Sequence, residues 1–509
     1  MPRFKQSDRD QGVMIPINYE KQIIPGTFEH AIDYIVENKI NTEALEANYK
    51  NDETGASAYS PKTLLKIVLF AYSRGIISSR KIEQACRENT VFMALSCGHA
   101  PDFTTIAGFI RLLKDEIKII FRDVLLICGE LDLLGGTEFA LDGCKMSSNA
   151  SKEWSGTFAN LRKKKEKLEE TVTYLLKKHR ETDRKDGAKD GRETERRKKQ
   201  IEMIEKKAAK IEKFLSENKP KPKSRRGERQ SNITDNESAK MKTSHGVIQG
   251  YNGMVISDSK NQVIIEAEAF GSGQEQELLK PMIEGAKQNA EAIGLGEGYL
   301  DGKTVIADTG SFCEENLEYL SNENIDGYIP DQQFRKRDPR FAQRDRHRPA
   351  KKALYTKEDF IYREETNDFI CPEGNILEFK LNQTFNNTSG RVYRAKQANC
   401  SKCTQRNKCV CSDNTRQRSL YVIEKYFNRN YSEEMKKKID TSEGRDIYSR
   451  RMGIVEPVFG NIRNAKGFNR FTLRTRAKVN IQWVLFCMIH NIEKIIKYGN
   501  HEKLSVLVR

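Results

Sequence analysis

The order of strand-like and helix-like segments between residues 136 and 330 constrains the fold of this chain more than any other feature of its sequence. The first strand-like segment, GTEFALDG, is predicted to end on Asp142. GVIQGYNGMVISD and NQVIIEAEAF follow as a hairpin pair joined by a polar turn. A helix-like segment, the strand-like KTVIAD ending on Asp308, a second helix-like segment and the short DGYIP complete the series. This order predicts an α/β fold with a mixed sheet of about five strands flanked by helices.

The region before this core, residues 1–135, is predicted to be helical. The segment YSPKTLLKIVLFAYSRG places Ser60 at an N-cap, a proline directly after it, and Gly75 where the helix should end. A second short helix, SSRKIEQACREN, and a longer one capped by Asp102 or Thr104 follow. Short helices joined by tight turns on a basic protein allow a helix-turn-helix that binds DNA, and a plain helical packing or dimerisation domain fits equally well.

Two charge-rich insertions interrupt the predicted core. In residues 159–230, leucines recur at intervals of seven, and later apolar residues recur at alternating threes and fours. This spacing predicts an antiparallel coiled-coil hairpin followed by a linker. The second insertion, residues 331–445, is basic and contains cysteines. The catalytic core would then consist of residues 136–158, 231–330 and 446–498.

The charge balance indicates a polyanionic partner. Lys and Arg number 88 against 72 Asp and Glu, a formal excess of 16 positive charges. Nucleic acid is the first candidate, and a basic, well-solvated surface is the alternative. The longest apolar run, WVLFCMI, is too short to cross a bilayer. We therefore predict a soluble cytoplasmic protein without membrane contact, whose 11 cysteines are thiols or metal ligands.

Three isolated acids stand out against this basic background. Asp142 and Asp308 are each predicted at the carboxyl end of a strand, where open α/β sheets bind ligands. Glu456 directly precedes Pro457, which predicts a position at the start of a helix with Arg463 two turns further along the same face. Taken alone, an Asp before Gly is usually a turn former, and a Glu before Pro is often a helix-start acid. If the helix docks beside the strand ends, the three acids converge.

Converged carboxylates repel one another unless a cation lies between them. Mg²⁺ prefers a few carboxylate oxygens together with water and phosphate oxygens. Two such ions about 4 Å apart can drive an in-line phosphoryl displacement. The sequence therefore predicts that Asp142, Asp308 and Glu456 bind two Mg²⁺ or Mn²⁺ ions, with the basic residues around Glu456 placed to hold phosphates.

A second candidate metal site lies in the cysteine-bearing insertion. The preferred ligands for a structural Zn²⁺ are Cys371, Cys400, Cys403 and Cys409, with Cys411 as a substitute for Cys409. A second C-x-x-C pair is missing, so reduced free thiols are the alternative. Zinc would hold together an insertion expected to have little core of its own.

The segments FALDGCKMSSNAS, VIADTGSFCEENL and YSRRMGIVEPVFGNIRNAKGFNRF resemble the catalytic blocks of bacterial insertion-sequence transposases. That family carries an Asp-Asp-Glu triad on an RNase H-like core, and the resemblance runs from about residue 30 to residue 495. It implies that Asp142, Asp308 and Glu456 are the metal-binding catalytic triad.

The resemblance also implies contacts with double-stranded DNA. The family's Tyr-Arg-Glu-Lys signature falls on Tyr448, Arg451, Glu456 and Arg463, so arginine replaces the final lysine, and the gap between Arg451 and Glu456 is one residue longer than in the best-known members. The residues expected to contact DNA are Lys145, Tyr448, Arg451, Arg463 and Lys466.

The implied activity is DNA transposition. Such an enzyme cuts at the terminal inverted repeats of an insertion sequence and joins the freed 3′ hydroxyl to target DNA, as at least a homodimer on the bacterial nucleoid. Two alternatives remain: a transposase-derived DNA-binding protein that no longer cuts, and a metal-dependent nuclease that never joins strands.

Overall fold

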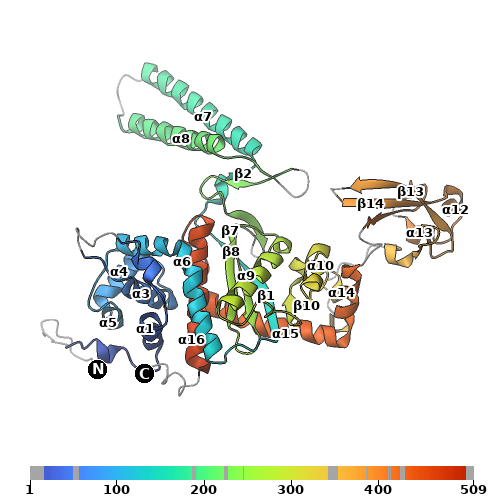
Figure 1. Cartoon of the computed structure of the whole chain (residues 1–509). Coiled ribbons are helices and arrows are strands. Elements are labelled where there is room, and N and C mark those ends of the chain that lie inside the picture. Colours follow the sequence, from blue (N-terminus) through green and yellow to red (C-terminus); the bar gives the residue numbers. More distant parts are fainter. Residues whose placement is uncertain are drawn as a thin grey trace, which may run out of the picture. The chain divides into compact units, whose positions relative to one another are not determined.

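The computed structural model describes residues 16–499 except 50–56, 186–190, 223–226, 245, 342–353, 386–387, 411, 413 and 425–429. The chain divides into two compact units. The core unit comprises Met1–Ser311, Leu320–Gly327 and Ile447–Arg509, and the insertion unit comprises Phe312–Tyr319 and Tyr328–Asp446. Figure 1 labels their helices and strands.

The N-terminal part of the core unit is helical, as predicted. Ser60 stands at the N-cap position of α3, and Gly75, with a φ of 72°, lies just beyond its end. Asp102 caps α6, since its carboxylate accepts hydrogen bonds from the backbone N–H groups of Thr104 and Thr105 at 2.7 and 3.2 Å. The helices are α1 (Phe28–Asn38), α2 (Glu43–Glu46), α3 (Pro61–Ser73), α4 (Ser79–Glu88), α5 (Thr90–Leu95) and α6 (Phe103–Glu130).

The central sheet of the core unit is mixed, as predicted. Its six strands run in the order β10-β9-β1-β7-β6, and β8 also pairs with β7. The predicted hairpin is β7 and β8, which pair antiparallel. β6 was not predicted, because its sequence AKMKT offers a single buried apolar side chain, Met241. The strands are β1 (Glu138–Ser147), β6 (Ala239–Thr243), β7 (Gly246–Asp258), β8 (Ile264–Phe270), β9 (Thr304–Ala307) and β10 (Asp326–Tyr328).

The first strand extends beyond its predicted end. β1 pairs antiparallel with β7 along its full length, with Asp142 opposite Val255, whereas β9 pairs in parallel only as far as Leu141. Asp142 therefore lies within β1 rather than at its end, because β7 continues to supply backbone partners after β9 has stopped.

The sheet is covered by helices. α16 (Arg476–Tyr498) packs against β8 and α6, which confirms the predicted contact with the sheet (Figure 1). Its Trp483 is fully buried, and the indole N–H donates to the carbonyl of Met254 at 3.0 Å. A Cβ on Gly253 would lie 2.8 Å from that ring, so glycine is required there. Trp483 is therefore a core residue. α9 (Leu279–Ala292) packs on β7 and β8. The next helix, α10, consists of residues Glu314–Asn322.

The predicted helix start at Pro457 is wrong. α15 runs over Ser442–Gly460 and contains the proline, and a π-helix (η8, Asn461–Ala465) follows it. Pro457 has no N–H to give to the carbonyl of Gly453, and the side-chain amide of Gln262 donates to that oxygen instead, at 3.3 Å. The helix can therefore continue through the proline.

The first insertion forms two long helices, α7 (Phe158–Lys185) and α8 (Gly191–Glu217), which lie side by side (Figure 1). The predicted turn between them falls largely outside the described residues. Two of the regularly spaced apolar residues that predicted the coiled coil, Leu161 and Ile211, belong to one apolar cluster with Phe158 and Phe214. Short strands flank the two helices: β2 (Ser155–Gly156) precedes α7, and β3 (Lys221–Pro222), β4 (Glu228–Arg229) and β5 (Ser231–Asn232) follow α8.

The insertion unit has a core of its own, contrary to our expectation. Phe369, Leu377, Tyr393 and Val422 are fully buried and pack together in an antiparallel sheet, β11-β12-β13-β14-β15. Charged residues between these apolar positions obscured the strand pattern in the sequence. The elements are α11 (Phe334–Arg337), β11 (Ile361–Arg363), β12 (Asp368–Ile370), β13 (Ile376–Phe385), β14 (Thr388–Ala395), α12 (Gln397–Ser401), α13 (Arg406–Cys409), β15 (Ser419–Ile423) and α14 (Tyr431–Asp440).

Candidate functional site

Asp142 lies on β1, and Asp308 comes directly after the neighbouring strand β9. Leu141 of β1 is in register with Ala307 of β9, so the next residues, Asp142 and Asp308, follow side by side. Burial raises the pKa of the Asp142 carboxyl, and the negative charge of Asp308 adds to that effect, while Arg451 opposes it. The mixed sheet therefore brings the two acids together although they are far apart in the sequence.

Glu456, which lies on α15, lines a cleft together with Asp142. Ile454 and Val455 are buried against Ala140 of β1, which fixes the helix on the sheet and leaves Glu456 exposed. A cleft of about 1090 Å³ is lined by both Asp142 and Glu456. Its cationic and other polar lining residues are Lys145, Ser147, Lys242, Thr243, Ser244, Arg463, Asn464 and Asn469.

The three acids are not gathered into a ready metal site. Within the described parts of the chain, no three His, Cys, Asp or Glu side chains are grouped as they would be around a metal ion. Asp308 does not line the cleft shared by Asp142 and Glu456. The structure thus places the two aspartates side by side and the glutamate in a cleft that it shares with Asp142.

Arg451 is held by the first aspartate. Its guanidinium Nη1 lies 2.5 Å from Oδ2 of Asp142, and its side chain is only 12% exposed. The other oxygen of Asp142 accepts the N–H of Gly143 at 2.8 Å. Tyr448 lies one turn before Arg451 on α15, with 5.9 Å between the guanidinium carbon and the centre of the ring. Tyr448 and Arg451 therefore belong to the site, and Arg451 acts as the counter-ion of Asp142.

Glu275 is a site residue that sequence reasoning missed. It lies in a 3-10 turn (η3, Glu275–Glu277) that packs against the turn containing Gly310 (η4, Thr309–Ser311). Its Oε1 pairs with Lys145 Nζ at 2.8 Å. Burial raises the pKa of Glu275, and the charge of Asp308 raises it further. In the sequence Glu275 looks like an ordinary acid ahead of a helix, so nothing in its segment distinguished it.

The two other predicted DNA contacts differ in exposure. Arg463 is exposed, lines the cleft and lies beside the thiol of Cys144. Lys466 is buried, and its ammonium pairs with Glu493 at 2.5 Å and donates to Asn461 at 3.1 Å. Lys466 is therefore used inside the protein to fix the π-helix, and Arg463 is the one available to a ligand in the cleft.

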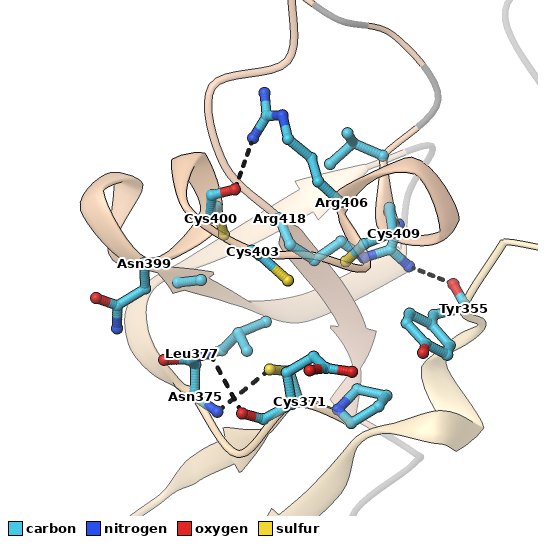
Figure 2. A pocket seen from close by; sticks show the side chains of 14 residues that line it. Tyr355, Cys371, Asn375, Leu377, Asn399, Cys400, Cys403, Arg406, Cys409 and Arg418 are labelled. Atoms are coloured by element: carbon cyan, nitrogen blue, oxygen red, sulfur yellow. Dashed lines mark hydrogen bonds between the residues drawn. The ribbon is translucent and has the colours of Figure 1, made fainter.

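The four preferred zinc ligands surround one cavity of about 30 Å³ in the insertion unit (Figure 2). They are Cys371, Cys400, Cys403 and Cys409, whereas Cys411 lies outside the described residues. The cavity is roomy enough for a single ion or water molecule. Burial raises the pKa of Cys409; Arg418 opposes that rise, and the other three thiols add to it.

Two arginines tie the cysteine segments together. Arg406 donates to the carbonyl of Cys400 at 3.1 Å, and Arg418 donates to those of Cys409 and Tyr355 at 2.8 and 2.9 Å (Figure 2). The wall opposite is a tight turn in which the backbone N–H of Asn375 donates to the sulfur of Cys371 at 3.3 Å. This backbone hydrogen bond holds the Cys371 sulfur in place at the cavity wall.

Comparisons with known families agree with the resemblance seen in the sequence. A family model described as "Transposase DDE domain" matches residues 370–496, which include Glu456 and the cysteine cavity but neither aspartate. A second, described as "Transposase domain (DUF772)", matches residues 17–112, in the helical N-terminal region. No curated protein and no solved structure matches the chain. None of the described helices is long and apolar enough to span a membrane. These two matches, which cover separate parts of the chain, support an insertion-sequence DDE transposase.

Proposed function

We propose that this transposase cuts DNA at the ends of its insertion sequence and joins the freed 3′ hydroxyl to target DNA in a Mg²⁺- or Mn²⁺-dependent reaction. The observation that carries the proposal is the register of β1 and β9, which sets Asp142 beside Asp308 while Glu456 lines the same cleft as Asp142. The strand order β8-β7-β1-β9-β10, with β9 parallel to β1, supports an RNase H-like core.

The residues of the cleft suit divalent metal ions and phosphates. Carboxylate oxygens are the ligands that Mg²⁺ prefers, and the cation already paired with Asp142 indicates that positive charge is favoured there. When bound, two such ions would activate the attacking hydroxyl and stabilise the leaving oxygen. Arg463 and Lys242 line the cleft and are exposed, so they can hold the DNA backbone on either side of the scissile phosphate.

We propose that the cysteine cavity binds a structural Zn²⁺. Four cysteines line one cavity, which matches a typical zinc ligand set in number and kind, although their sulfurs are not yet grouped as they would be around an ion. Zinc would stabilise a unit that already has an apolar core.

We also propose roles for the remaining regions of the chain and for its assembly. Residues 1–135 bind DNA or dimerise, residues 159–230 form a coiled-coil hairpin, and the protein works in the cytoplasm as at least a homodimer on DNA with inverted repeats. The excess of 16 positive charges supports a nucleic-acid partner.

The test uses two DNA substrates carrying a transposon end, one intact and one already cut to expose the 3′ hydroxyl. We expect wild-type protein with Mg²⁺ to cut the first and to join the second to plasmid DNA. Asp308→Asn should abolish both while leaving end binding nearly intact. Asp301→Asn, an exposed aspartate in a surface turn, is the matched control and should behave as wild type.

Each alternative predicts a different result. A transposase-derived binding protein would bind ends without cutting them. A nuclease would cut the intact end and never join the pre-cut one. Wild-type rates in Asp308→Asn would show that the triad assignment is wrong.

A further inference from the structure

The carboxylate of Glu275 faces the same small space as that of Asp308. A Cβ on Gly310 would stand 2.2 Å from Oε2 of Glu275 and 3.0 Å from Oδ1 of Asp308. A side chain on Gly310 would therefore displace Glu275, and the two acids approach each other beside this glycine. The Glu275 side chain is only 11% exposed, so solvent screens this approach poorly.

A buried amide oxygen points to a missing partner beside these acids. Asn252 of β7 is fully buried, and it is the cross-strand neighbour of Lys145. Its Nδ2 makes a long hydrogen bond of 3.4 Å to Glu275, while its Oδ1 has no hydrogen-bond partner among the described residues. That oxygen lies 2.7 Å from where a Cβ of Gly143 would be, next to Asp142. Buried carbonyl oxygens are rarely left unpaired, and they are good ligands for hard cations or for the water molecules on them.

Two side-chain cations neutralise the acids of this region. Arg451 pairs with Asp142, and Lys145 pairs with Glu275. Asp142 and Glu275 thus each bind one side-chain cation, at positions that metal ions could occupy instead. Lys145 is 27% exposed, so it can leave its position more easily than the largely buried Arg451.

We propose that Glu275 is a fourth carboxylate ligand of the catalytic metal ions, and that Lys145 releases Glu275 when a divalent ion binds. The inference rests on the proposed function, because the ion is one of those assigned to Asp142, Asp308 and Glu456. Once released, the ammonium of Lys145 is free to contact a DNA phosphate, which gives this residue its predicted role only in the loaded enzyme.

The test measures Mn²⁺ binding to the full-length protein without DNA, by the loss of the free-ion electron paramagnetic resonance signal. We expect Glu275→Gln to weaken the binding of at least one ion tenfold or more. Glu277→Gln is the matched control, because Glu277 lies in the same turn, is 43% exposed and pairs with Arg229. It should bind Mn²⁺ as the wild type does.

A double-mutant cycle examines the part played by Lys145. Lys145→Met removes the competing cation, so we expect it to tighten Mn²⁺ binding severalfold in the wild-type background and to have no such effect together with Glu275→Gln. If Glu275 served only to orient Lys145 toward DNA, both variants would lose DNA affinity and keep wild-type Mn²⁺ affinity, which would overturn the proposal.

Asp308→Asn separates this inference from the proposed function. Loss of Mn²⁺ binding in Asp308→Asn with wild-type binding in Glu275→Gln would refute only the fourth ligand. Wild-type binding in both would refute the metal site itself. If circular dichroism shows that Glu275→Gln does not fold, Glu275→Asp replaces it. This variant keeps the charge but has a shorter side chain, so its oxygens no longer reach the ion and Mn²⁺ binding should weaken in the same way.

Discussion

The guanidinium of Arg451 lies 2.5 Å from the carboxylate of Asp142, across the interface between α15 and the central sheet. One oxygen of Asp142 is thereby used by Arg451, and the other by the N–H of Gly143. A divalent ion that binds Asp142 has to share or displace the arginine. The pair therefore couples metal binding to the position of α15, which also carries Glu456.

This competition predicts the effect of removing the arginine. Arg451→Ala should tighten Mn²⁺ binding by roughly threefold to tenfold, since the lost pair is worth about 1 kcal/mol at this partial exposure. The same variant should cut DNA more slowly, because Asp142 and the DNA lose a cation. Equilibrium dialysis against Mn²⁺ measures the first effect. Arg450→Ala, whose side chain is 58% exposed and lies 3.5 Å from Glu138, serves as the control. A weaker Mn²⁺ affinity in Arg451→Ala would contradict the competition.

The sequence predicted most of the order of the strands but not how far each one extends. Asp308 lies directly after β9, as predicted, because the apolar run and the turn residues after it are both local signals. Asp142 was placed wrongly at a strand end, since the length of β1 depends on β7, a partner more than 100 residues away. The Pro457 error has a similar cause, because Gln262 satisfies the backbone from a distant loop.

The candidate site was predictable only where a motif is local. Asp142, Asp308 and Glu456 each stand in a recognisable segment. Glu275 comes close to Asp308 through the packing of two turns, and Arg451 acquires its aspartate partner through the docking of α15 on β1. Long-range contacts of this kind leave no periodicity or spacing in the sequence.

Loss of one cysteine should remove the metal from the insertion unit. We expect the purified protein to carry about one zinc per chain and Cys400→Ser to carry much less, since a structural site needs four ligands. Unfolding of the insertion unit should then occur at a lower temperature. Mass spectrometry of the metal content and a thermal melt measure the two effects. Cys97→Ser, an exposed thiol of the core unit, should keep the zinc. Zinc-free wild-type protein would rule out the site.

Acid should destabilise the protein through His490. Burial lowers the pKa of His490 to about 3 from 6.5. The side-chain oxygen of Asn461 accepts a hydrogen bond from Lys466, so the amide N–H of Asn461 donates to Nδ1 of His490. The protonated Nε2 of His490 then donates to the carbonyl of Gln262 at 2.9 Å. A second proton therefore has no acceptor, and the folded state keeps the ring neutral.

The sign follows from these two pKa values. The stability that His490 contributes is present above pH 6.5 and is lost as the pH falls toward 3, by about 1.4 kcal/mol for each pH unit. His490→Gln should reduce this slope in urea unfolding between pH 4.5 and 6.5. His99→Gln, at an exposed position, should leave it unchanged. Equal slopes in wild type and His490→Gln would contradict the assignment.

The buried Glu266 of β8 should destabilise the protein as the pH rises from about 4.5 to about 7. One of its oxygens accepts a hydrogen bond from Asn289 at 2.5 Å, while the other accepts none from the residues that the structure describes and lies 3.7 Å from Lys118. Burial raises the pKa of Glu266 to about 7 from 4.5. Because the folded-state pKa is the higher one, the contribution to stability is full below pH 4.5 and is lost as the pH rises through 7.

Glu266→Gln keeps the shape and the Asn289 contact without the charge. The variant should therefore gain stability over wild type as the pH rises from 5 to 7, by up to about 1.4 kcal/mol for each pH unit, keep that gain at pH 8, and match wild type or fall below it at pH 4.5. Urea unfolding at these pH values measures the difference. Glu268→Gln is a control of opposite sign, because Glu268 pairs with Lys118 and Arg476 and should cost stability at pH 8. A difference between Glu266→Gln and wild type that does not change with pH would mean that Glu266 is already ionised in the folded protein at pH 5.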